Sequence, residues 1–149
     1  MIIFFDTSAL VRRYHHIEPG AQAVRRLCLR ANQNDLVILN ITSIEVASAF
    51  NRALREGRID IEHRDRLWRL FLAHRRVQYR VVQFDARIAR RAQQLLFSHP
   101  IRAYDAVQIA GALQVVHTLA SGVELRFCTA DRAQARAAGA EGLSIEFIL

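Results

Sequence analysis

Short runs of consecutive apolar residues alternate along the chain with longer stretches in which apolar residues recur every three or four positions. Runs of four or five mostly apolar residues predict buried strands. The predicted strands are Ile2–Phe5, Leu36–Leu39, Arg80–Phe84, Leu125–Cys128 and Leu143–Phe147. The helical period predicts helices over Thr7–Tyr14, from Pro19 onward, and over Ser43–Arg55, Ile61–Arg76, Asp85–Phe97, Tyr104–Leu119 and Asp131–Ala138. We expect Gly57 and Gly139 to end the helices before them.

This alternation is typical of a parallel sheet with helices on both faces, because parallel strands need long crossover connections. The predicted fold class is α/β, a three-layer α/β/α sandwich around a five-stranded, mostly parallel sheet. No linker or internal repeat divides the sequence, so we expect residues 1–149 to form a single domain. A chain of 149 residues buries about 70% of its unfolded surface in one core.

Composition indicates which kind of partner the protein binds and in which cellular compartment it is found. The formal net charge is +7, which favours a polyanionic partner. All 21 basic residues are arginine, so a coding bias explains the basicity as well as RNA binding does, and both explanations stay open. Cys28 and Cys128 fall in apolar segments and are expected to be buried thiols of a reducing compartment. Because no signal peptide or long apolar span is present, we expect a cytoplasmic protein without a membrane anchor.

Four acidic residues lie between a predicted strand and the helix that follows it, or in the first turn of a predicted helix. They are Asp6, Glu45, Asp105 and Asp131. In a parallel α/β sheet these points converge on one edge, where ligands bind. Four carboxylates gathered there would repel one another without a neutralising cation, so the pattern predicts a bound metal. If all four share one pocket, the rest of the molecule carries +7 plus 4, or +11.

Each acid also has a purely structural interpretation. Asp6 and Asp131 suit helix N-caps, and Asp105 suits the first turn of a helix. Thr42-Ser43-Ile44-Glu45 fits a capping box in which Glu45 reaches back to the backbone. Asp85 also follows a strand and opens a helix, and we interpret it as a plain N-cap. Spacing alone does not separate Asp85 from Asp131.

Polar residues near the acids favour a shared site. Thr7 and Ser8 directly follow Asp6, and their hydroxyl groups are suited to orienting a carboxylate. Gln108 lies three residues after Asp105 on a helix that is otherwise apolar, where a polar side chain must be satisfied or used. Thr129 precedes Asp131. Two arginines beside the acids, Arg102 and Arg132, are candidates for contacts with substrate phosphates, or else ordinary solvated side chains.

With these motifs in order along its whole length, the chain resembles a PIN domain, and most closely the toxin ribonucleases of the VapC type. The resemblance rests on Asp6-Thr7-Ser8-Ala9-Leu10, Ser43-Ile44-Glu45-Val46, Arg102-Ala103-Tyr104-Asp105-Ala106 with Gln108, and Thr129-Ala130-Asp131. It implies that the four acids hold one or two divalent ions and cut RNA. It also implies that Ser8 and Thr129 support the site.

The expected cofactor is Mg²⁺, with Mn²⁺ as a substitute, because an all-oxygen ligand set without His or Cys suits hard cations. The resemblance further implies an RNA substrate, a homodimer and a cognate antitoxin protein that covers apolar helices near the N-terminus. The residues that we expect on that antitoxin surface are Leu10, Val11, Tyr14, Leu27 and the helix Ile61–Arg76.

Two alternatives from other classes remain at this point. One is a non-catalytic module of PIN fold that binds RNA or a partner without cutting, although four intact acids speak against it. The other is a phosphotransfer domain of the haloacid dehalogenase or receiver kind. The haloacid dehalogenase kind needs a second Asp two residues after Asp6, where this chain has Ser8. The receiver kind needs a lysine, which this chain lacks.

Overall fold

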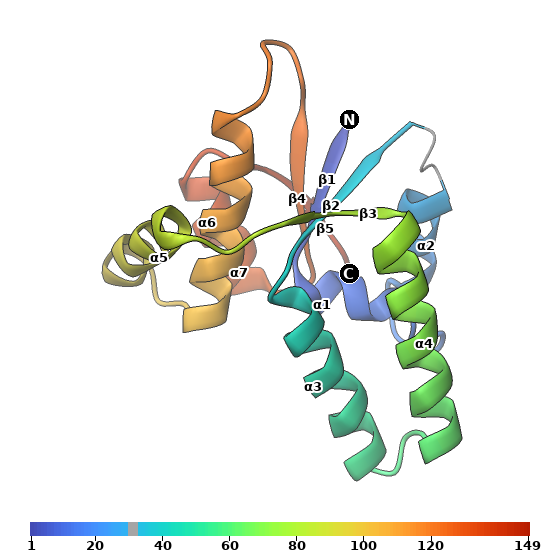
Figure 1. The fold of residues 1–149 in the computed structure, drawn as a ribbon. Coiled ribbons are helices and arrows are strands. Elements are labelled where there is room, and N and C mark those ends of the chain that lie inside the picture. The colour runs from blue at the N-terminus through green and yellow to red at the C-terminus, as the bar shows by residue number, and fades with distance from the viewer. Residues whose placement is uncertain (30–32) are drawn as a thin grey trace.

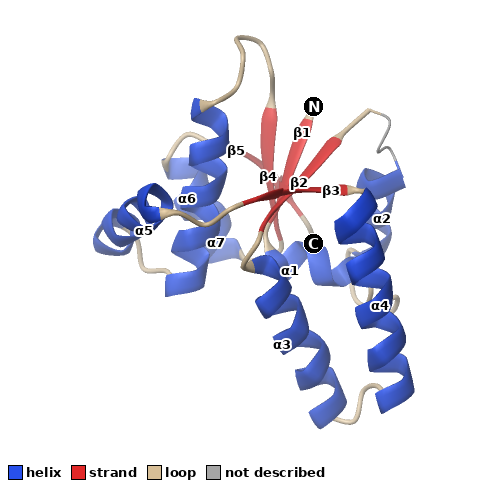
Figure 2. Cartoon of the chain, in the orientation of Figure 1, coloured by secondary structure: helices blue, strands red, loops and turns tan. Residues whose placement is uncertain are grey.

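A computed structural model describes residues 1–29 and 33–149, and its strands form one sheet (Figures 1 and 2). The strands are β1 (Ile2–Phe5), β2 (Asp35–Leu39), β3 (Tyr79–Val82), β4 (Leu125–Thr129) and β5 (Ser144–Phe147). Their order is β3-β2-β1-β4-β5, and each neighbouring pair is parallel. The prediction of a mostly parallel five-stranded sheet is therefore confirmed.

Helices cover both faces of this sheet (Figure 1). They are α1 (Thr7–Leu10), continued by the 3₁₀ turn η1 (Val11–Arg13), and α2 (Ala21–Leu29), α3 (Thr42–Arg55), α4 (Ile61–Val77), α5 (Ala86–Ser98), α6 (Ala103–His117) and α7 (Arg132–Ala140). Helices α5, α6 and α7 pack on one face, and α1 to α4 pack on the other. The molecule is thus the three-layer sandwich that the sequence predicts.

Alternate residues of the strands point into two separate cores. On β1, Phe4 faces α6 and stacks on Phe127 of β4 with ring centroids 5.9 Å apart. Its neighbours Ile3 and Phe5 face the opposite core with α1 and α3. Side chains on both faces of a central strand are buried because helices cover both, which explains why the strands read as continuous apolar runs. Cys28 and Cys128 are free and buried, as expected.

Several predicted boundaries differ from the observed ones. The first helix changes to a 3₁₀ turn at Val11 instead of continuing to Tyr14, and α2 begins at Ala21 rather than at Pro19. Gly57 has a φ of 71° and follows α3 as predicted. The prediction for Gly139 is wrong, because α7 continues to Ala140 and Gly142 adopts the left-handed conformation, with a φ of 90°.

One close contact sets the position of α6 on the sheet. Gly111 of α6 lies against Leu39, the last residue of β2, and both are buried. A Cβ atom at position 111 would come within 2.8 Å of the Leu39 side chain, closer than carbon atoms pack. The absence of a side chain at Gly111 therefore allows α6 to approach the sheet.

The expected antitoxin surface is partly wrong, because two of its residues belong to the core. Leu10 is fully buried, and Tyr14 lies with its ring against Phe50 and Phe71. Val11 is half-buried, and Leu70 on α4 is exposed. Apolar residues next to a short helix serve the core here, because α3 and α4 pack over them.

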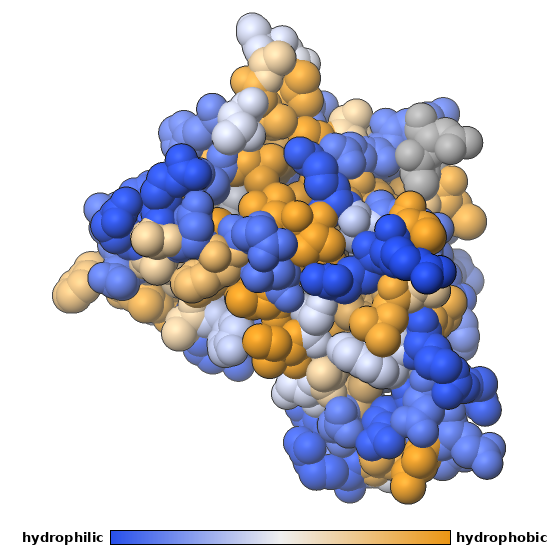
Figure 3. Space-filling view, in the orientation of Figure 1, coloured by the Kyte–Doolittle hydropathy of each residue, from blue (hydrophilic) through white to orange (hydrophobic). Residues whose placement is uncertain are grey.

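Figure 3 shows mainly hydrophilic side chains over the tip of the α3–α4 hairpin, which projects away from the sheet, and a mixture of hydrophilic and hydrophobic side chains over α5. The exposed residues at the hairpin include Arg55, Glu56, Arg58 and Glu62. Within the described parts of the chain, no helix combines the length and the apolar character needed to cross a membrane.

A partly buried polar cluster joins η1 to α4 and β3. The Tyr14 hydroxyl contacts His74 Nδ1 and the Tyr79 hydroxyl, each at 3.0 Å, and Arg13 donates to Tyr79 and to Gln78. Burial, together with the positive charge of Arg13, lowers the pKa of His74 from 6.5 to about 4. The imidazole is therefore neutral in the folded protein at neutral and mildly acidic pH.

We predict that this histidine makes folding sensitive to mild acid. Between pH 6.5 and about 4 the unfolded chain binds a proton that folded His74 does not, so the free energy of unfolding falls as the pH falls. His74→Gln should flatten that slope in denaturant titrations, whereas His117→Gln, at an exposed position on α6, should keep it. Equal slopes for the wild type and His74→Gln would contradict the prediction.

Candidate active site

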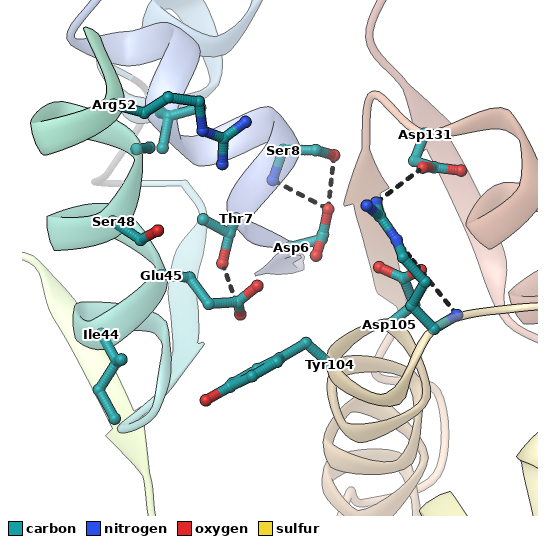
Figure 4. A pocket seen from close by; sticks show the side chains of 13 residues that line it. Asp6, Thr7, Ser8, Ile44, Glu45, Ser48, Arg52, Tyr104, Asp105 and Asp131 are labelled. Carbon is teal, nitrogen blue, oxygen red and sulfur yellow. Dashed lines mark hydrogen bonds and ion pairs between the residues drawn. The ribbon is translucent and has the colours of Figure 1, made fainter. Parts of the chain in front are cut away.

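The carboxyl ends of β1, β2 and β4 meet the amino ends of α1, α3, α6 and α7 around one open cavity of about 420 Å³. All four acids predicted from the sequence line it, together with Thr7 and Ser8 (Figure 4). From β1 the strand order runs through β2 to β3 on one side, and the chain then crosses back to place β4 and β5 on the other side of β1, so the cavity lies at the switch point of the sheet.

Asp6 is the most enclosed of the four acids, with 3% of its surface exposed. It caps α1 by accepting from the Ser8 amide at 3.0 Å, and it also accepts from the Ser8 hydroxyl. Gln134 Nε2 donates to its other oxygen at 3.1 Å. Burial raises the pKa of Asp6, these hydrogen bonds oppose that rise, and the negative charge of Asp105 adds to it. The carboxylate is thus held in one orientation in an environment that disfavours its charge.

Glu45 faces the same cavity from the first turn of α3. Its Oε1 accepts from Thr7 Oγ1 at 2.9 Å and from Gln108 Nε2 at 2.7 Å. Burial raises the pKa of Glu45, and the charges of Asp6 and Asp105 contribute in the same direction. The capping-box interpretation of Glu45 is wrong, because α3 has no side-chain cap and the carboxylate points away toward Thr7 and Gln108.

Asp105 and Asp131 both act on helix ends and also line the cavity. Asp105 accepts from the backbone amide of Arg102 at 3.2 Å, and Asp131 caps α7 by accepting from the Gln134 amide at 2.9 Å. Capping uses one oxygen of Asp131, and its other oxygen lies 3.8 Å from the Arg102 guanidinium. The structural and the functional interpretation of these residues are therefore compatible.

Comparison with family models matches residues 3–140 to the PIN domain. The chain belongs to the PIN domain family. Comparison with curated proteins gave no match.

Solved structures share the fold of this PIN domain at low sequence identity. A chain of VapBC2 from Rickettsia felis bound to a promoter DNA fragment has a TM-score of 0.69 and 16% identity, with 100% of both chains covered. DNA-bound VapBC from Salmonella typhimurium has a TM-score of 0.68 and 15% identity, over 99% of this chain and 98% of that chain. PAE2754 from Pyrobaculum aerophilum has a TM-score of 0.67 and 19% identity, over 97% and 89%.

Sequence reasoning missed Gln134, which joins two of the acids of this PIN domain. The buried side-chain amide of Gln134 donates from Nε2 to Asp6, and its Oε1 accepts from Thr129 Oγ1 at 2.6 Å. The backbone N–H of Gln134 donates to the Asp131 carboxylate, which caps α7. Gln134 lies on the inner face of α7, as Gln108 does on α6, and packing against the sheet decides which face that is. Gln108 and Thr129 are both fully buried, where they contact the acids from behind rather than line the cavity.

Arginines contribute unequally to the site. Arg102 lines the cavity and lies between two acids, with Nε 3.4 Å from Asp105 and Nη2 3.8 Å from Asp131. Arg132 is exposed and is not among the lining residues. Arg52, which was not predicted as a site residue, lines the opposite wall from α3. In residues 1–29 and 33–149, no three acidic, histidine or cysteine side chains converge closely enough to hold a metal ion as they stand.

Asp85 lies outside the site, as its interpretation as a plain N-cap requires. It caps α5 by accepting from the Ile88 amide at 3.0 Å and pairs with Arg87 at 3.3 Å. The hydrogen bond from Ile88 lowers the pKa of Asp85. His15 packs edge-on against Phe50, and neither it nor His16 lines the acidic cavity.

We predict that Gln134→Leu destabilises the fold and disturbs Asp6. The substitution removes a buried donor from a buried carboxylate, which costs about 1–3 kcal/mol of unfolding free energy. The pKa of Asp6 should rise further in the variant, as followed by NMR of its carboxyl carbon. Gln94→Leu on the exposed face of α5 is the control and should stay within about 0.5 kcal/mol of the wild type. Unchanged stability in Gln134→Leu would show that the Asp6 contact is unimportant.

Proposed function

We propose that this protein is a metal-dependent endoribonuclease of the VapC type. The observation that carries the proposal is the meeting of four carboxylates from four separate segments in one cavity of a PIN domain. A site that only stabilised the fold would not gather like charges around open space, because their repulsion destabilises the folded state. PIN family membership supports hydrolysis of a nucleic acid, and the +7 net charge suits a polyanionic substrate.

The donor set fits a hard divalent cation. Asp6, Glu45, Asp105 and Asp131 offer oxygen only, and no cysteine or histidine lines the cavity, which favours Mg²⁺ or Mn²⁺ over zinc. The position of Arg102 supports the same conclusion, because its guanidinium already lies where positive charge offsets Asp105 and Asp131. These four acids would hold the cation, which when bound supplies charge stabilisation for phosphoryl transfer and an activated water.

The surrounding residues of the chain orient the carboxylates. Ser8 and Gln134 donate to opposite oxygens of Asp6, so this side chain has little freedom to rotate. Thr7 and Gln108 both donate to one oxygen of Glu45, Oε1, and so orient this carboxylate from one side. In our proposal, Arg102 contacts a phosphate of the RNA once a divalent ion has displaced it from Asp105, because a guanidinium pairs with phosphate as readily as with carboxylate.

We further propose that the partner is an antitoxin protein and that the chain forms a homodimer. The fold neighbours from Rickettsia felis and Salmonella typhimurium are VapBC structures, which supports an antitoxin partner. A second cavity, of about 240 Å³, lies between η1, α2 and α4 and combines apolar and basic side chains. It is lined by Arg13, Tyr14, His16, Arg25, Cys28, Leu29, Leu67, Leu70 and His74. This groove shares Tyr14 and part of the helix Ile61–Arg76 with the surface expected from the sequence, and it suits a peptide with apolar and acidic residues.

Asp6→Asn should abolish RNA cleavage without unfolding the protein. The variant loses a metal ligand but also loses a buried charge, so its stability should be close to or above that of the wild type. Asp85→Asn is the matched control and should keep full activity, since Asn caps a helix about as well as Asp. Cleavage is measured on RNA in Mg²⁺ or Mn²⁺, with EDTA as the blank. An active Asp6→Asn enzyme would refute the proposal, and wild-type metal binding without cleavage would favour a non-catalytic PIN module.

Divalent ions should stabilise the fold. A ligand that binds only the folded state adds about 2.7 kcal/mol at a hundredfold excess over its Kd, so the melting temperature should rise in millimolar Mn²⁺. Asp105→Asn should reduce this rise and Asp85→Asn should not. Arg102→Gln should enlarge it, because the ion no longer competes with a guanidinium for Asp105 and Asp131. No shift in the wild type would mean that these acids do not hold a metal.

A further inference from the structure

One wall of the acidic cavity is apolar and exposed. Tyr104, next to Asp105 in the first turn of α6, is 47% exposed, and Ile44, next to Glu45 in the first turn of α3, is 61% exposed. Both line the cavity, and Figure 4 shows the Tyr104 ring reaching across below the acids toward Ile44. Tyr14 and Tyr79, the other two tyrosines, are buried in the core.

The position of Tyr104 sets it apart from ordinary exposed apolar residues, which are common on protein surfaces. Among the described residues, its hydroxyl has no hydrogen-bond partner within the chain and its ring packs on no other aromatic ring. Phe97 on α5 is more exposed, at 95%, but lies outside the cavity. A free aromatic face at the rim of a phosphodiesterase site is available for stacking on a nucleobase.

Arg52 stands on another part of the cavity wall. It follows Glu45 by two helical turns, so it lies on the same face of α3, with Ser48 between them. Other arginines in the described parts of the chain pair with acids, for example Arg91 with Glu141 and Arg126 with Glu146. No carboxylate lies within ion-pair distance of Arg52 among these residues. Its charge therefore remains available for a phosphate group.

We propose that the cavity contains a subsite for an unpaired nucleotide, in which Tyr104 and Ile44 contact the base and Arg52 contacts a backbone phosphate beyond the acids. This inference rests on the proposed nuclease function and names the residues that would select an unpaired nucleotide at this site. In a duplex each base is paired and stacked inside the helix, and its face is not free to meet a side chain. A base that has left its stack presents a face to Tyr104 while its phosphates follow the acids and Arg52.

Removal of the Tyr104 ring and removal of the Arg52 charge should affect RNA binding differently. Loss of one stacking aromatic weakens binding of single strands about tenfold, and the hydroxyl is not needed for it. Loss of a phosphate contact weakens binding of single and double strands alike and lowers the salt dependence of binding. Tyr104→Ala should therefore raise KM for a single-stranded RNA about tenfold with kcat nearly unchanged, and Tyr104→Phe should restore KM.

The test measures cleavage kinetics and binding on the full chain with a short, fluorescently labelled RNA, single-stranded or annealed to its complement. Binding is read by anisotropy in EDTA, so that it does not depend on metal or on catalysis. Phe97→Ala and Arg55→Gln are the controls for Tyr104→Ala and Arg52→Gln, because both lie exposed and outside the cavity. We expect single strands to bind better than duplexes, and only Tyr104→Ala to remove that preference.

The outcomes separate this inference from the proposed function. Unaltered KM and binding in Tyr104→Ala, or equal binding of duplex and single strand by the wild type, would overturn the subsite even if the enzyme cuts RNA. If the wild type cuts no RNA in Mn²⁺ but binds single strands better than duplexes, and Tyr104→Ala removes that preference, the nuclease proposal is overturned and the subsite is supported.

Discussion

The burial of Asp6 beside three other acids is the constraint on which the rest of the site depends. An enclosed carboxylate is unstable unless donors surround it, and here the donors come from distant parts of the chain: Ser8 on α1, and Gln134 on α7. Thr129 at the end of β4 contacts both Ser8 and Gln134 and thereby connects them. The same hydrogen bonds that favour the charged form of Asp6 also fix where β1, β4 and α7 meet. Stability and the geometry of the cavity are therefore parts of one network.

Much of the fold and the four acids follow from local patterns in the sequence. Strands buried on both faces read as apolar runs, and parallel strands bring their carboxyl ends to one edge, so Asp6 and Asp131 were expected at the same edge of the sheet. Asp85 also follows a strand, yet it caps α5 away from the cavity. The difference arises because β3 is at the edge of the sheet, whereas β1 and β4 are central. Strand order is a tertiary property, and spacing along the chain does not contain it.

Other residues escaped prediction for the same reason. Tyr14 follows a short helix, and whether it is exposed depends on how α3 and α4 fold back over it. Arg52 becomes part of the cavity because α3 runs along it for two turns after Glu45, which depends on the tilt of the helix against the sheet. Gln134 resembled a surface residue of an alanine-rich helix until the face of α7 that meets the sheet was known. Pairwise contacts between elements decide all three.

The contact between Gly111 and Leu39 limits which side chains can occupy position 111. Leu39 ends the strand that leads to α3 and Glu45, and Gly111 lies on the helix that begins beside Asp105, so the two residues act as a spacer between opposite walls of the cavity. A larger side chain at position 111 would push α6 outward and carry Asp105 with it, unless position 39 became smaller at the same time. The side chain at position 39 therefore limits what position 111 can carry, although neither residue lines the cavity.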